Sequence, residues 1–113
     1  MGKKQISKFV GEAALAAGDQ PTAVRYLLQE IGVMAPGGAV EIRVPPYGAV
    51  QCVGGLDHRR GTPPNVLELS PDNFLALSLG SISWDELAQS GQLLASGVLV
   101  DELRNLFPRT AVR

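Results

Sequence analysis

The chain's only histidine, His58, stands beside two arginines, Arg59 and Arg60, in the segment Asp57–Pro64. Guanidinium groups bind carboxylate or phosphate oxygens through paired hydrogen bonds, so these residues, together with the hydroxyl of Thr62, could anchor the anionic head of a ligand. The more ordinary interpretation is a stiff, charged surface loop whose arginines pair with neighbouring carboxylates. Loops carry binding residues more often than cores do, so both interpretations stay open.

Cys52 is the only cysteine and precedes His58 by six residues. A thiolate beside an imidazole can act as a nucleophile, but no motif that would stabilise an oxyanion accompanies the pair. A lone cysteine in a strand is more often a small buried hydrophobic side chain. One cysteine and one histidine also cannot supply the ligands of a typical zinc site. We therefore expect no catalytic residue and no bound metal.

Other polar groups are accounted for by local structure. The carboxylate pairs Asp85-Glu86 and Asp101-Glu102 fall in the first turns of expected helices, where the helix dipole favours negative charge. The glycine pairs match no dinucleotide-binding or phosphate-binding spacing, so we predict no cofactor. Trp84, the only tryptophan, fits either core packing or the lining of an apolar ligand cavity, and periodicity alone does not separate the two.

The composition limits the class of protein. The chain has 113 residues and a net charge of −1, which fits one domain over 1–113 with a polar, basic arm over 1–8 and gives no electrostatic footprint for nucleic acid. Hydrophobic residues make up 45% of it, which excludes a disordered chain. No apolar run is long enough for a membrane span or a secretory signal, so we expect a cytoplasmic protein.

Periodicity predicts two helices, then three strands, and then three helices with a fourth strand among them, in chain order. Helical spacing with capping or stop residues predicts helices over 9–17, 20–34, 71–79, 84–90 and 99–107. Alternating or β-branched runs predict strands over 40–44, 49–53, 65–69 and 93–96, the first two as a hairpin. This order indicates an α+β fold, with an antiparallel or mixed sheet and helices on one side.

The second half of the chain resembles a known family. The string NVLELSPDNFLALSLGSISWDELAQSGQLLASGVLVDELRNLFP, from Asn65 to Pro108, is similar to the carboxy-terminal half of the sterol carrier protein 2 family. It contains that family's D-x-F-L-A-L helix start, followed by glycines at the family's spacing at Gly80, Gly91 and Gly97. Residues 41–53 and 58–66 resemble more specifically the small actinobacterial sterol-carrier-like branch.

The resemblance implies a sheet of about five strands with helices packed on one face around an apolar cavity. It implies binding, and transfer, of a sterol, fatty acyl chain or other lipid without bond-making. Burial of each CH₂ group contributes about 0.8 kcal/mol, so affinity needs no special motif. The positions that would line the cavity are Val50, Cys52, Phe74, Leu77, Ile82, Trp84, Leu87, Leu94, Leu99, Leu103, Leu106 and Phe107. The polar anchor would be His58, Arg59, Arg60 or Thr62.

Two alternatives remain at this stage, because a fold does not settle a function. A sterol-carrier-like fold also follows mycothiol-dependent maleylpyruvate isomerase domains, in which the loop at His58–Pro64 would hold an anionic substrate. The third interpretation is a plain protein-interaction module. The expected partner is a hydrophobic small molecule, with transient membrane contact compatible and the oligomeric state left open.

Overall fold

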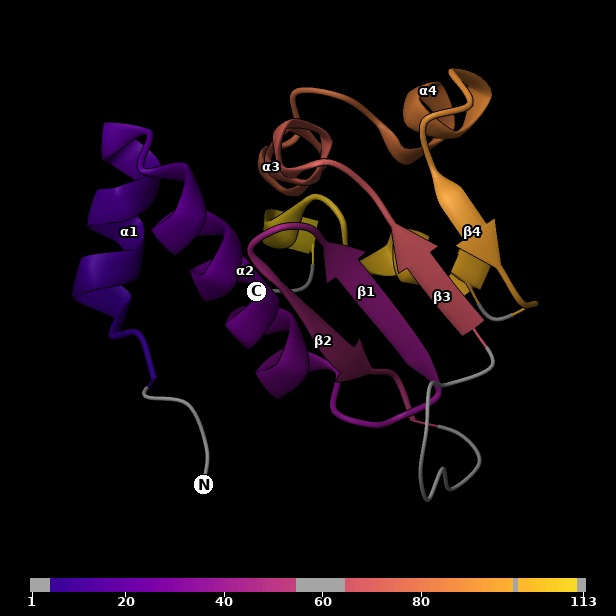
Figure 1. The fold of residues 1–113 in the computed structure, drawn as a ribbon, viewed down its shortest axis with the longest axis horizontal. Helices are drawn as coiled ribbons and strands as arrows, with labels where there is room; N and C mark the ends of the chain where they lie inside the picture. Colours follow the sequence, from indigo (N-terminus) through magenta and orange to yellow (C-terminus); the bar gives the residue numbers. More distant parts are fainter. Residues whose placement is uncertain (1–4, 55–64, 99, 112–113) are drawn as a thin grey trace.

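The structure is a computed structural model that describes residues 5–54, 65–98 and 100–111 of the chain (Figure 1). Within these ranges helices flank a single sheet at its sides and on one face. The elements in chain order are α1 (Lys8–Ala17), α2 (Gln20–Met34), β1 (Val40–Val44), β2 (Gly48–Cys52), β3 (Asn65–Glu68), α3 (Pro71–Leu79), α4 (Trp84–Gln89), β4 (Leu94–Ser96) and the 3₁₀ helices η1 (Val100–Leu106) and η2 (Arg109–Ala111).

The sheet is mixed and open, with the strand order β2-β1-β3-β4. β1 pairs antiparallel with β2 and parallel with β3, and β3 pairs antiparallel with β4. The α+β class and the mixed sheet are therefore confirmed. The described residues form four strands, not about five. Each alternating run of the sequence forms one strand, whereas the fifth strand came from the resemblance alone.

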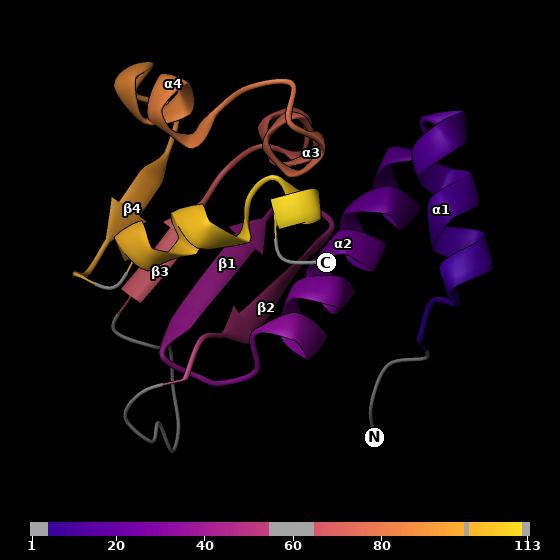
Figure 2. The same cartoon turned by 180° about the vertical axis from the view of Figure 1, so that it is seen from behind.

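Alternation along the strands gives the sheet a buried inner face and an outer face. Val40, Ile42 and Val44 of β1 are fully buried, whereas Glu41 and Arg43 between them are only half-buried. Figure 2 shows η1 lying across β3 and β1 on the inner side, and Figure 1 shows no described helix over these two strands on the other side. The core thus lies between one face of the sheet and the helices.

Several helix boundaries follow from local capping chemistry. The hydroxyl of Ser70 accepts a hydrogen bond from the Asn73 backbone at the start of α3. Ser83 and Glu86 form a capping box at the start of α4. Gly80, at φ +88°, ends α3 in the left-handed conformation that glycine adopts without strain. Asp19 occupies the N-cap position of α2, but its side chain makes no capping hydrogen bond.

The C-terminal segment differs from the expected α-helix. It forms η1 and η2, and the residues that η1 buries are Val100, Leu103 and Leu106. A spacing of three aligns side chains along the axis of a 3₁₀ helix, whereas on an α-helix the same stripe would turn gradually around the axis. The expected stripe began instead at Leu99, which lies outside the described residues.

The described part of the expected N-terminal arm is attached to the fold. Ser7 caps α1 by accepting a hydrogen bond from the Val10 backbone. The Ile6 backbone N–H donates to Gln29 Oε1 at 2.9 Å, and Gln29 Nε2 donates to the Ile6 carbonyl at 2.8 Å. This side-chain amide of α2 therefore binds the backbone before α1 much as a neighbouring strand would, which the sequence pattern did not indicate.

Candidate functional site

Most of the expected cavity-lining residues belong to the hydrophobic core. The buried members are Cys52, Phe74, Leu77, Trp84, Leu87, Leu103, Leu106 and Phe107, and Val50 and Ile82 pack against them partly buried. The core contains three aromatic rings in contact. The Phe107 ring meets Phe74 edge-on and Trp84 nearly face-on, with 6.2 Å between ring centroids in each case. Side chains thus occupy the place of the expected cavity, which the structure does not confirm as open space.

Leu94 is placed elsewhere than expected. It pairs with Glu68 in the β3–β4 register, and the residues of such a pair point to the same face of a sheet. Glu68 belongs to the outer face, and the Leu94 side chain is 64% exposed. Strand alternation therefore places Leu94 on the outer face of the sheet in this conformation, and its role as a lining residue stays a prediction.

The structure does not describe the four expected polar anchor residues. His58, Arg59, Arg60 and Thr62 all lie outside the described residues, so their role stays a prediction. Cys52 is described and fully buried, and burial raises the pKa of its thiol to about 11. A thiol with that pKa stays protonated at neutral pH and is a poor nucleophile, which favours the packing interpretation of Cys52.

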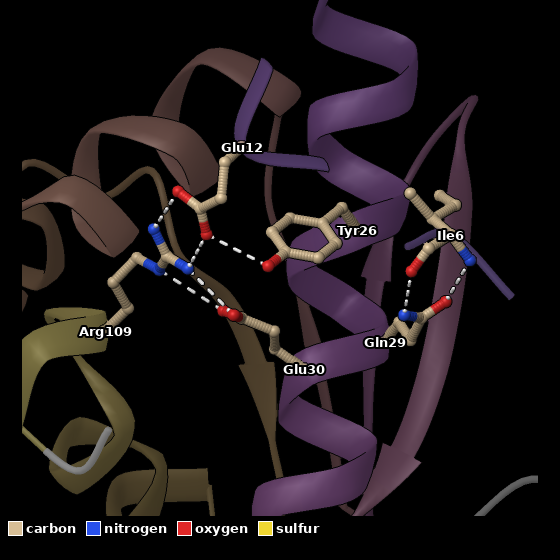
Figure 3. Close-up of polar contacts among 6 residues, drawn as sticks. All are labelled: Ile6, Glu12, Tyr26, Gln29, Glu30 and Arg109. Atoms are coloured by element: carbon tan, nitrogen blue, oxygen red, sulfur yellow. Dashed lines mark hydrogen bonds and ion pairs between the residues drawn. The ribbon is translucent and has the colours of Figure 1, made fainter. Parts of the chain in front are cut away.

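An ionic cluster that the sequence analysis missed joins both ends of the chain (Figure 3). Arg109 of η2 donates from Nη2 to Glu12 Oε2 of α1 at 2.7 Å and to Glu30 Oε2 of α2 at 2.8 Å. The Tyr26 hydroxyl donates to Glu12 at 2.9 Å. No sequence signal marks this cluster, because its members lie far apart along the chain.

The cluster perturbs the titration of its members. The hydrogen bond from Arg109 lowers the pKa of Glu12, since it favours the ionised carboxylate. Burial, followed by the hydrogen bond to Glu12, raises the pKa of Tyr26 to about 12. The two carboxylates raise the pKa of Arg109 further above its ordinary range. Glu12, Tyr26 and Arg109 therefore keep their ordinary charge at neutral pH, which suits a structural ion pair better than a proton-transfer site.

A second surface feature lies beside β2. A hollow of about 250 Å³ is bounded by the N-terminal segment, α2 and the β1–β2 hairpin. Among the described residues, its lining combines apolar side chains with one cation, Arg25, whose guanidinium carbon lies 5.9 Å from the centre of the Tyr47 ring. Of the expected lining residues that the structure describes, Val50 alone borders this hollow. Arg25 was not expected here, because it is an exposed residue in mid-helix without any motif.

Two further classes of site are not seen in the described ranges. Residues 5–54, 65–98 and 100–111 contain no group of three or more His, Cys, Asp or Glu side chains that could hold a metal ion. In the same part of the chain, every helix is too short or too polar to cross a bilayer.

These features define a class of protein: a small α+β fold with a mixed sheet, an apolar layer beneath its helices and ion pairs that join its last described turn to its first two helices. The comparison with known families narrows that class. Residues 17–109 match the family described as bacterial SCP ortholog, and the chain therefore belongs to this bacterial sterol carrier protein-like family. The resemblance found in the sequence is thereby confirmed. No curated protein sequence matches the chain significantly.

Proposed function

We propose that the chain binds a single hydrophobic ligand, such as a sterol or fatty acyl chain, in the apolar layer beneath its C-terminal segment. We call that segment, residues 100–111, the C-terminal cover. The membership of the family supports a hydrophobic ligand. Binding, rather than catalysis, is the proposed activity, since a lipid requires apolar area and one polar partner but no nucleophile.

One observation inside the core carries this proposal. Ser78 of α3 is 1% exposed, and its hydroxyl has no hydrogen-bond partner among the described residues. A buried hydroxyl without a partner costs about 1–3 kcal/mol and calls for an explanation. Ser78 follows Phe74 by four residues and shares its helix face, so the hydroxyl lies on the side of α3 that carries the aromatic cluster. The hydroxyl or carboxyl group of a bound lipid would satisfy it.

The C-terminal cover is the element that would move. It contributes Leu103, Leu106 and Phe107 to the core, yet it consists of 3₁₀ turns, which have poorer hydrogen-bond geometry than an α-helix. Its last described turn is held at the periphery by Arg109. Displacement of the cover would expose the aromatic cluster, and the ligand would replace the apolar contacts that the cover gives up.

The single tryptophan provides the first test. Trp84 is 9% exposed and stacks on Phe107, so a fatty acid brominated along its chain should quench its fluorescence on binding beneath the cover. The same acid without bromine is the control and should not quench. Native mass spectrometry should show one lipid per protein. A lipid adduct without quenching would overturn the proposed location, and the absence of both would favour the interaction-module interpretation.

Substitution at Ser78 gives a second, independent test. Ser78→Ala removes the unpaired hydroxyl, so the ligand-free protein should become more stable while affinity for a cholesterol or fatty acid probe falls at least about fivefold. Opposite signs for stability and affinity are not expected of a merely structural residue. Leu103→Arg should abolish binding because it places a charge in the apolar layer, and Leu103→Met, similar in volume, should keep it. Full affinity in folded Ser78→Ala would contradict the anchor role.

A further inference from the structure

The hollow beside β2 has an apolar floor contributed by three elements. Ile6 precedes α1, Leu28 belongs to α2 and Val50 belongs to β2, and all three border the same space. Gly48 on β2 also borders it, and a Cβ at this glycine would lie 3.4 Å from Leu28 Cδ1, in ordinary contact. The glycine thus leaves the floor open where another residue would begin to fill it. The remaining lining residues are Gln5, Arg25, Gln29, Tyr47 and Ala49.

Arg25 differs from the other arginines in the described part of the chain. Arg43, Arg104 and Arg109 each form an ion pair with at least one carboxylate. Arg25 has no carboxylate partner within those ranges and instead lies over the Tyr47 ring. The ring fixes the guanidinium at the border of the hollow and leaves its hydrogen-bond donors available. A positive charge held beside an apolar floor complements an amphiphile with a negative head.

The position of Ile6 on the floor of the hollow is fixed by a specific interaction. Gln29 donates to and accepts from the backbone of Ile6, as Figure 3 shows, and this pair of bonds holds the N-terminal segment against α2. Ile6 therefore keeps its place on the floor without a long helix or strand around it. Gln29 is a positioning residue for the hollow, because its amide is already used by the protein backbone.

We infer that this hollow is a binding site for monocarboxylates with a chain of about four to eight carbons, with the carboxylate on Arg25 and the chain over Ile6, Leu28 and Val50. A single guanidinium matches one carboxylate through two parallel hydrogen bonds, whereas a phosphate dianion would keep an uncompensated charge. The volume of 250 Å³ is below the range of about 300–1,000 Å³ usual for drug-sized ligands, which favours a short chain. The inference is independent of the site beneath the C-terminal cover.

Titration of the ¹⁵N-labelled protein with octanoate tests the assignment. Backbone signals of Ile6, Leu28 and Val50 should shift together and saturate, and each added methylene from butanoate to octanoate should raise affinity by up to about fourfold. Acetate lacks the chain and octan-1-ol lacks the charge, so both should bind at least about tenfold more weakly. Shifts confined to other residues, or equal binding of octan-1-ol, would overturn the inference.

Two exposed arginines provide matched variants. Arg25→Gln should weaken octanoate binding at least about tenfold and leave binding of octan-1-ol unchanged, whereas Arg104→Gln should leave both unchanged. Gln29→Ala should weaken the binding of octanoate and of octan-1-ol alike, because it releases the N-terminal segment that carries Ile6 and leaves the charge of Arg25 in place. Equal octanoate affinity in Arg25→Gln and the parent protein would refute the carboxylate site. Octyl phosphate that binds as tightly as octanoate would refute the preference for a monocarboxylate. Quenching of Trp84 by a long brominated acid reports only on the core layer, so the two proposals fail separately.

Discussion

Arg109 Nη2 lies 2.7 Å from Glu12 Oε2, although 97 residues separate the two along the chain. The contact joins the last described turn of the C-terminal cover to the first helix, and Glu30 of α2 accepts from the same guanidinium. Two kinds of contact therefore hold the cover in place: its apolar side chains pack in the core, and one ionic cluster binds its end at the periphery. Weakening the cluster should release the cover without disturbing the sheet.

Arg109→Gln should lower the free energy of unfolding by about 1–2 kcal/mol. The Arg109 side chain is 19% exposed, so its loss leaves two partly buried carboxylates side by side without their shared cation. Urea denaturation measures the change. Arg104→Gln is the control, since the ion pairs of Arg104 lie at the surface, and it should change stability much less. Equal effects of the two variants would contradict the role of the cluster.

The stabilising effect of Glu12 should depend on pH. Arg109 lowers the pKa of Glu12 in the folded protein, so its contribution is present above the ordinary carboxyl pKa of about 4.3 and is lost as pH falls through the lower, folded value. The stability difference between the parent protein and Glu12→Gln should therefore be constant near neutral pH and shrink below about pH 4. A difference that stays constant throughout acid titration would show that Glu12 is not paired.

Leu103→Ala and Leu94→Ala should differ strongly in stability. Leu103 is fully buried beneath the cover, so its truncation leaves a cavity and should cost about 2–4 kcal/mol. Leu94 is exposed on the outer face of the sheet, where truncation should cost less than about 0.5 kcal/mol. Thermal or urea denaturation distinguishes them. Similar large losses for both would mean that Leu94 is covered in solution.

Cys52 should resist thiol reagents while the protein is folded. The side chain is fully buried at the end of β2 and its pKa is raised to about 11, so little thiolate exists at neutral pH. Labelling by an aromatic disulfide reagent should be slow in the native protein and complete in urea. Because Cys52 lies on the inner face of the sheet, a bound lipid that closes the core should slow labelling further. Immediate labelling of the native protein would contradict the burial of Cys52.

The alternation over 40–44 identified the first strand, and helical spacing with capping residues identified the helix that begins at Trp84. These signals are local, because side-chain direction along a strand and satisfaction of the first backbone N–H groups depend on residues a few positions apart. The family resemblance depended on the same kind of local spacing. It therefore indicated the class of fold and the class of ligand, but added a strand that the described residues do not form.

The proposed site beside β2 depends on contacts between residues that lie far apart in the sequence. Arg25 gave no signal in the sequence, because a mid-helix arginine becomes a site only when a hairpin places Tyr47 and Val50 beside it. The apolar character of Leu94 likewise says nothing about which face of the sheet the β3–β4 register assigns to it.

Periodicity, caps and motif spacing are properties of neighbouring residues, so the sequence alone was enough to predict the family and most helices and strands, although not the 3₁₀ form of the C-terminal segment. The folded chain alone shows which apolar residues meet, that Arg109 joins Glu12, and that Arg25 has no carboxylate partner among the described residues. Packing and ion pairing act through space, and a mixed sheet with the order β2-β1-β3-β4 brings together segments that lie far apart along the chain.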